Sequence, residues 1–159
     1  DFALQLLLAA KEEGLHTCCE TTGFLKTELF AKIIEQVDYI LFDMKHWDRE
    51  KHFEKTGVYN DIILENMGYA VSQGIPLIAR IPVIPKFNAS LKDAAGMAEN
   101  LCKLGIREVH LLPFHQFGEK KYEQLETEYE MSGVPQLHPE QLQKYIQVFL
   151  DRGLDASFK

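Results

Sequence analysis

The chain has 159 residues, 46% of them hydrophobic, and a formal net charge of -7 at pH 7. This length suits one domain with a substantial core, so we expect residues 1–159 to form a single domain. The acidic balance argues against a duplex nucleic-acid binder and against a polybasic membrane anchor, because both need clustered cations. With no apolar run near the roughly 18 residues of a membrane span and no signal-peptide pattern, we predict a cytoplasmic protein.

Hydrophobic periodicity predicts helices and strands in alternation along the chain. Leucines at helical spacing open the chain, and Gly14 follows where a helix C-cap belongs. Apolar runs then predict four strands, at 15–19, 39–42, 75–84 and 109–114. Helical spacing recurs between and after them, at 30–37, 62–74, 92–104 and 139–152.

This rhythm indicates an α/β fold. Continuous apolar strands that alternate with helices of ten or more residues are typical of a parallel sheet with helices over its outer side. Four strands are too few to close a barrel. Residues 154–158 could add a short edge strand.

The cysteines of the chain have no metal-binding pattern. Cys18 and Cys19 are adjacent and Cys102 is distant. Adjacent cysteines cannot easily close a disulfide, so the set favours a reducing compartment. We expect buried, inert thiols.

Polar residues gather where the predicted strands end, which is where parallel α/β architectures bind ligands. Arg80 stands alone in an apolar strand, and a buried guanidinium is costly without an anion. Its partner could be Asp43 or Glu20 in a structural salt bridge, or a ligand carboxylate. Both alternatives remain open from the residues alone.

Asp43 and Lys45 lie two positions apart, so on an extended strand they point to the same face. They could form a simple ion pair, or place an acceptor and an ammonium group together in a site. Lys45 could equally be a Schiff-base nucleophile. His115 follows the fourth strand before a turn, so it is expected at the mouth of the sheet.

Two further groups of polar residues are assigned structural roles. The other histidines lack metal-ligand context, so we expect surface or packing positions for them. The charged stretch 119–130 is predicted to be a solvated loop.

Several segments, in this order and spacing, resemble the glycyl-radical-enzyme activating family of radical S-adenosylmethionine enzymes, to which pyruvate formate-lyase activating enzyme belongs. The resemblance covers essentially the whole chain. It is carried by 16–24 (HTCCETTGF), 41–45 (LFDMK), 78–85 (IARIPVIP) and 111–115 (LLPFH), with Gly118, Lys121, Tyr122 and Tyr129 beyond them.

The resemblance implies a (β/α)6 partial barrel, of which this chain would supply the last four strands. S-adenosylmethionine would lie across the strand ends, bound to a [4Fe-4S] cluster. By the family pattern, Lys45 and Arg80 would contact S-adenosylmethionine and His115 would lie near its adenosine end. Asp43, with Glu20 and Thr21, would line a monovalent-cation site.

The implied chemistry is reductive cleavage of S-adenosylmethionine to methionine and a 5′-deoxyadenosyl radical. That radical would take a glycine hydrogen from a partner glycyl radical enzyme, with flavodoxin or ferredoxin as electron donor. The Cys-x-x-x-Cys-x-x-Cys loop that ligates the family's cluster is not in this sequence. We therefore expect a C-terminal portion without iron–sulfur ligands or catalytic residues of its own, and inactive by itself.

Two other functions compete with this one. The first is an aldolase-like barrel with Lys45 as Schiff-base residue, for which four strands are too few. The second is a non-enzymatic α/β binding module, in which Arg80, Asp43 and Lys45 form a network that binds no ligand.

Overall fold

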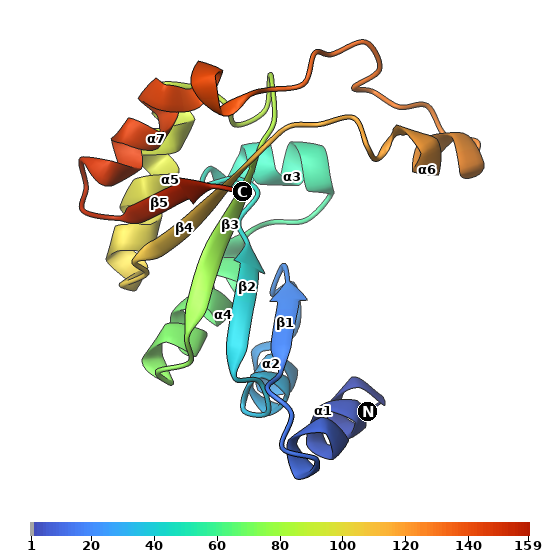
Figure 1. The fold of residues 1–159 in the computed structure, drawn as a ribbon, viewed down its shortest axis with the longest axis vertical. Coiled ribbons are helices and arrows are strands. Elements are labelled where there is room, and N and C mark those ends of the chain that lie inside the picture. The colour runs from blue at the N-terminus through green and yellow to red at the C-terminus, as the bar shows by residue number, and fades with distance from the viewer. Residues whose placement is uncertain (1) are drawn as a thin grey trace.

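The computed structural model describes residues 2–159. Its sheet is entirely parallel, and its strands follow one another in chain order (Figure 1). A sheet wound in one direction is a portion of a barrel, whereas a doubly wound sheet reverses its strand order. The strands are β1 (Cys18–Thr21), β2 (Tyr39–Asp43), β3 (Leu77–Val83), β4 (Glu108–Pro113) and β5 (Asp155–Phe158).

Helices connect the strands. Helix α2 packs on α4, α4 on α5 and α5 on α7, so these four form a continuous layer. The helices are α1 (Phe2–Glu12), α2 (Thr27–Ile34), α3 (Arg49–Thr56), α4 (Asp61–Ser72), α5 (Leu91–Leu104), α6 (Glu119–Gln124) and α7 (Gln143–Leu150), with a 3-10 turn η1 (Pro139–Leu142) before α7.

The two faces of the sheet differ in burial. On the face toward the helices, alternate residues such as Ile40, Phe42 and Ile81 are fully buried and form the core with the helices. Their neighbours in sequence, such as Leu41 and Asp43, are only partly buried and point to the opposite face. We call this second surface the open face.

The strand pattern agrees with the sequence prediction, with local differences. The edge strand suggested at 154–158 exists as β5, which pairs with β4 and makes five strands rather than four. Strand β1 begins three residues later than predicted. The final helix is divided into η1 and α7, and the loop expected at 119–130 contains the short helix α6.

Helix α3 was not predicted at all. Its side chains are almost all polar and only His52 is buried, so hydrophobic periodicity gives no signal. Local capping specifies it instead. Asp48 accepts hydrogen bonds from the Glu50 and Lys51 backbone amides, and Gly57 closes the helix with a left-handed φ of 75°.

The prediction of buried thiols is wrong. Cys18 and Cys102 are exposed and Cys19 is half-buried. Cys18 and Cys19 alternate along β1, which is an edge of the five-stranded sheet, so neither lies in the packed centre. Cys102 lies on the outer side of α5.

Helix length and composition bear on the membrane prediction. Among residues 2–159, no helix is both long enough and apolar enough to cross a membrane.

Candidate functional site

Strand pairing brings four charged residues together on the open face. Asp43 and Arg80 are direct partners in the register of β2 and β3. Lys45 Nζ lies 2.7 Å from Asp43 Oδ2, and Arg80 lies 2.7 Å from Glu20 Oε1 and 3.9 Å from Asp43 Oδ1. We call Glu20, Asp43, Lys45 and Arg80 the charged cluster.

The cluster is internally neutral yet only partly enclosed. Two carboxylates offset two cations, so the structural salt bridge considered for Arg80 is present. The side chains of Lys45 and Arg80 still keep 31% and 20% of their surface exposed. Asp43 Oδ1 is buried and accepts no hydrogen bond from residues 2–159. The cluster therefore leaves part of both cationic side chains open to a polar ligand.

Two other predicted site residues have no hydrogen bond or ion pair with the cluster in the described part of the chain. The Thr21 hydroxyl accepts a hydrogen bond from the Gly23 backbone amide at 2.9 Å. His115 is exposed, with its ring 4.3 Å from that of Phe117. Both lie at strand ends, as predicted, but their side chains serve the local turns.

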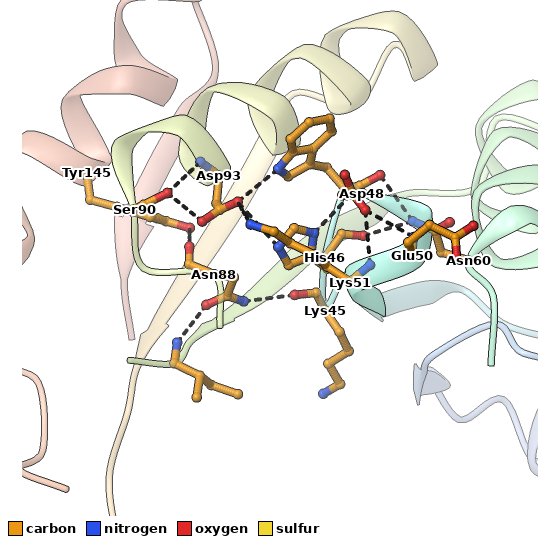
Figure 2. A network of polar contacts seen from close by, with 12 residues as sticks. Lys45, His46, Asp48, Glu50, Lys51, Asn60, Asn88, Ser90, Asp93 and Tyr145 are labelled. Atoms are coloured by element: carbon orange, nitrogen blue, oxygen red, sulfur yellow. Dashed lines mark hydrogen bonds and ion pairs between the residues drawn. The ribbon is translucent and has the colours of Figure 1, made fainter. Parts of the chain in front are cut away.

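A second polar network, centred on His46 and Asp93, was not predicted as a site (Figure 2). His46 is fully buried, and its Nδ1 accepts the Asp48 backbone amide at 2.9 Å. Its Nε2 therefore carries the proton in the neutral ring and faces Asp93 Oδ1 at 3.3 Å. Burial lowers the pKa of His46, although Asp93 opposes this change.

Asp93 is the centre of this network. Its carboxylate accepts hydrogen bonds from Trp47 Nε1 at 3.2 Å, from Lys51 Nζ at 3.3 Å and from the Ser90 hydroxyl. Burial alone would raise the pKa of Asp93, but these donors outweigh it and the pKa is lowered. The spacing of Ser90 and Asp93 matches a helix capping box, which is the signal that could have identified Asp93 from the sequence.

A third polar group, formed by Tyr39, Glu108 and His110, lies on the open face near the amino-terminal ends of β2 and β4. The Tyr39 hydroxyl donates to Glu108 Oε2 at 3.3 Å, and His110 Nε2 lies 3.8 Å from Glu108 Oε1. Burial lowers the pKa of His110 and Lys159 adds to that effect.

The side-chain geometry bears on metal binding. Within residues 2–159, no three His, Cys, Asp or Glu side chains are grouped so that they could hold a metal ion. Glu20 and Asp43, predicted to line a cation site, both contact Arg80.

Comparison with known proteins identifies the relatives of this chain. It is 40% identical over 156 residues to the 4-hydroxyphenylacetate decarboxylase activating enzyme of Clostridioides difficile (strain CD196), and 36% identical over 146 residues to the choline trimethylamine-lyase activating enzyme of Oleidesulfovibrio alaskensis. The chain is homologous to glycyl-radical-enzyme activating enzymes. The alignments cover 97% and 89% of the chain, but 49% and 47% of these activating enzymes, so it spans about half their length.

Solved structures agree with this homology. A domain of a pyruvate-formate lyase-activating enzyme from Bacteroides vulgatus ATCC 8482 matches with a TM-score of 0.81 at 26% identity, covering 99% of this chain and 89% of that domain. The predicted partial-barrel fold of an activating enzyme is thereby confirmed. No protein-family profile matches the chain.

Proposed function

We propose that this chain is the S-adenosylmethionine-binding part of a radical activating enzyme. The protein that contains it would cleave S-adenosylmethionine reductively and take a hydrogen atom from a glycine of a partner glycyl radical enzyme. The observation that carries the proposal is the 40% identity to an activating enzyme over 97% of the chain. The charged cluster on the open face is the site that we propose for S-adenosylmethionine.

The charged cluster fits the polar groups of S-adenosylmethionine. Lys45 and Arg80 offer partly exposed cations that suit its carboxylate and hydroxyl oxygens. The exposed ring of His115 would contact the adenosine end. When bound and reduced by one electron, S-adenosylmethionine supplies a 5′-deoxyadenosyl radical.

The contribution of these residues is binding and orientation. Asp43 holds the Lys45 ammonium at a fixed place on the open face, through the 2.7 Å contact. Glu20 does the same for Arg80. Side chains that are already oriented lose less freedom when a ligand binds, which favours a single binding geometry.

An iron–sulfur cluster is not supported by this chain's own residues. Cluster ligation needs several thiolates at one place. Cys18 and Cys19 point to opposite faces of β1, and Cys102 is on α5. The proposal therefore places the cluster's ligands elsewhere in the complete enzyme, and predicts that this chain alone cleaves no S-adenosylmethionine. An electron donor of the flavodoxin or ferredoxin type, and a monovalent cation near Glu20, Thr21 and Asp43, belong to the same proposal.

The structure bears differently on the two competing functions, a Schiff-base enzyme and a binding module without catalysis. A Schiff-base role for Lys45 is disfavoured, because its ammonium is engaged by Asp43 and the sheet is an open one of five strands. A binding module without catalysis is favoured by one observation, namely that both cations of the charged cluster already have carboxylate partners.

The substitution Arg80→Gln in the complete enzyme distinguishes the proposed S-adenosylmethionine site from a charged cluster that binds no ligand. The enzyme, prepared anaerobically with its cluster, is assayed for S-adenosylmethionine binding, for 5′-deoxyadenosine formation and for the partner's glycyl radical by electron paramagnetic resonance. We expect Arg80→Gln to weaken binding by about 10- to 100-fold, as for loss of a hydrogen bond to a charged group.

Glu99→Gln is the matched control for this test. It breaks an exposed ion pair with Lys103 on α5, far from the cluster, and binding should not change. If the Arg80→Gln enzyme binds S-adenosylmethionine as tightly as the unmodified enzyme, the charged cluster has only a structural role and the proposal fails.

A further inference from the structure

The hydrogen-bond ladder between β2 and β3 is interrupted beside the charged cluster. The Met44 backbone amide donates to the Arg80 carbonyl at 2.8 Å, which continues the parallel register of the two strands. The next ladder bond would come from the amide of residue 82. That residue is Pro82, which has no N–H, so the ladder cannot continue. Lys45 leaves the strand at this point.

The side chain of Asn88 bridges the interruption. Its amide donates to the Lys45 carbonyl and to the Pro82 carbonyl, each at 2.8 Å. Its Oδ1 accepts the Ile84 backbone amide at 2.7 Å. Asn88 is fully buried, and both its amide hydrogens and its carbonyl oxygen are bonded to backbone groups, one in the segment after β2, one within β3 and one just after β3.

The arrangement connects the two cations of the cluster. Lys45 belongs to the segment after β2, and Arg80 lies on β3, two residues before Pro82. Figure 2 shows the Lys45 backbone directed at Asn88 while its side chain extends away from this network. A shift of the Lys45 backbone would therefore move its ammonium group relative to Arg80.

The neighbouring loops are held by the same device. Asn60 donates to the His46 and Trp47 carbonyls, at 3.0 and 3.2 Å. Asn66 donates to the Gly23 and Leu25 carbonyls, at 2.8 and 2.7 Å. These asparagines are almost completely buried. Of the three, Asn88 is bonded to the carbonyl of a cluster residue, Lys45.

We propose that Asn88 is a positioning residue for the S-adenosylmethionine site, and that it sets the distance between the Lys45 and Arg80 side chains by bonding the backbone on both sides of the Pro82 interruption. The inference rests on the proposed function for its ligand, but not for its geometry. Asn88 itself does not touch the open face.

The test uses Asn88→Asp in the complete enzyme. Aspartate has nearly the same shape but replaces the amide donor with a carboxylate oxygen, which would face two carbonyl oxygens. We expect the KM for S-adenosylmethionine to rise at least tenfold with kcat changed less than threefold, because misplaced Lys45 weakens binding before and during the reaction alike. If this variant fails to fold, Asn88→Ser replaces it, and one remaining donor predicts a smaller rise in KM.

A double-mutant cycle separates positioning from general damage. If Asn88 acts through Lys45, then Asn88→Asp added to Lys45→Met should raise KM less than twofold further. Independent, additive losses would overturn the proposal. Tyr145→Phe is the matched control, because it removes the 3.0 Å bond to the Asn88 backbone carbonyl and leaves the Asn88 side chain in place. Its KM should stay unchanged.

Hydrogen exchange distinguishes failure of this inference from failure of the proposed function. The backbone amides of residues 44–48 should exchange faster in Asn88→Asp than in the unmodified enzyme, whatever the ligand is. If exchange is faster in Asn88→Asp but the unmodified enzyme itself neither binds nor cleaves S-adenosylmethionine, the proposed function alone is refuted. Unchanged exchange would refute the positioning role of Asn88.

Discussion

One short segment, residues 43–48, contributes to two regions of opposite character. Asp43 and Lys45 belong to the charged cluster on the open face, where Lys45 stays 31% exposed and Asp43 Oδ1 accepts no hydrogen bond from the described residues. His46 lies one residue further and faces the helices, where it is fully buried beside Asp93. These neighbours in sequence therefore lie on different sides of the sheet.

The difference is between polar groups whose hydrogen-bonding capacity is used within the protein and polar groups that keep some of it. Asp93 receives donors from Trp47, Lys51 and Ser90, so it has little capacity left for a ligand. The groups of the charged cluster make fewer hydrogen bonds than they have the capacity for. We therefore expect changes behind the sheet to reduce stability, and changes on the open face to reduce ligand binding.

Asp93→Ala should have the largest effect on stability. It leaves the Trp47 Nε1 and His46 Nε2 donors without their carboxylate acceptor, and each buried donor left unpaired costs about 1–3 kcal/mol. Urea unfolding measures the loss. Arg80→Gln is the comparison on the open face and should cost at most about 1 kcal/mol. Equal losses for the two variants would remove the distinction between the regions.

Gly96→Ala should come next. Gly96 lies on α5 directly under the indole of Trp47, and a Cβ at this position would overlap the ring. We expect a loss of about 1–3 kcal/mol from overpacking, although alanine is the better helix former.

Gly68→Ala on α4 is the control for this overpacking. The nearest atom to its Cβ would be the mobile end of Leu104, at 3.2 Å. This change should be neutral or stabilise the protein by up to about 1 kcal/mol, as measured by thermal unfolding. A stable Gly96→Ala protein would show that Trp47 is not held in place by the network.

The smallest expected effect is a change in pH dependence. Burial lowers the pKa of His46, so the unfolded chain binds a proton that the folded protein does not. His46 therefore contributes stability above its unfolded pKa of about 6.5, and this contribution is lost as pH falls toward the folded pKa. Urea midpoints between pH 5 and 8 should decline less steeply with falling pH in His46→Gln than in the unmodified protein.

Comparing the two proteins also separates the effect of His46 from the effects of the other titrating groups. His110, whose pKa is also lowered by burial, is present in both proteins and cancels. Asp93 has a lowered pKa too, and its share of stability is lost only in more acidic solution, below its unfolded value of about 3.9. An unchanged slope in His46→Gln would mean that folding does not lower the pKa of His46.

Most of the strands and helices, and the salt bridges of the charged cluster, could be predicted from the sequence for a physical reason. Apolar runs and helical spacing are local patterns, and they located the strands within a few residues. Asp43 and Lys45 are two apart, so strand alternation places them together without knowledge of the sheet. Arg80 in an apolar strand predicts an acidic partner, and Glu20 and Asp43 are the carboxylates that contact it.

The network behind the sheet could not be predicted in the same way. His46 and Asp93 are 47 positions apart, and nothing local indicates that they meet. Asn88 looks like an ordinary turn residue until its bonds to Lys45 and Pro82 are seen. Helix α3 is specified by its caps, which are weaker signals than periodicity.

Strand order also has a consequence for synthesis on the ribosome. Since each strand pairs with the next one in the chain, the sheet can grow by one strand at a time as the polypeptide emerges. Arg80 and Asp43 can meet once β3 is available. The bond from Tyr145 to Asn88 spans 57 residues and must wait for α7. The nascent protein can therefore bring the charged side chains of the open face together before α7 packs against α5.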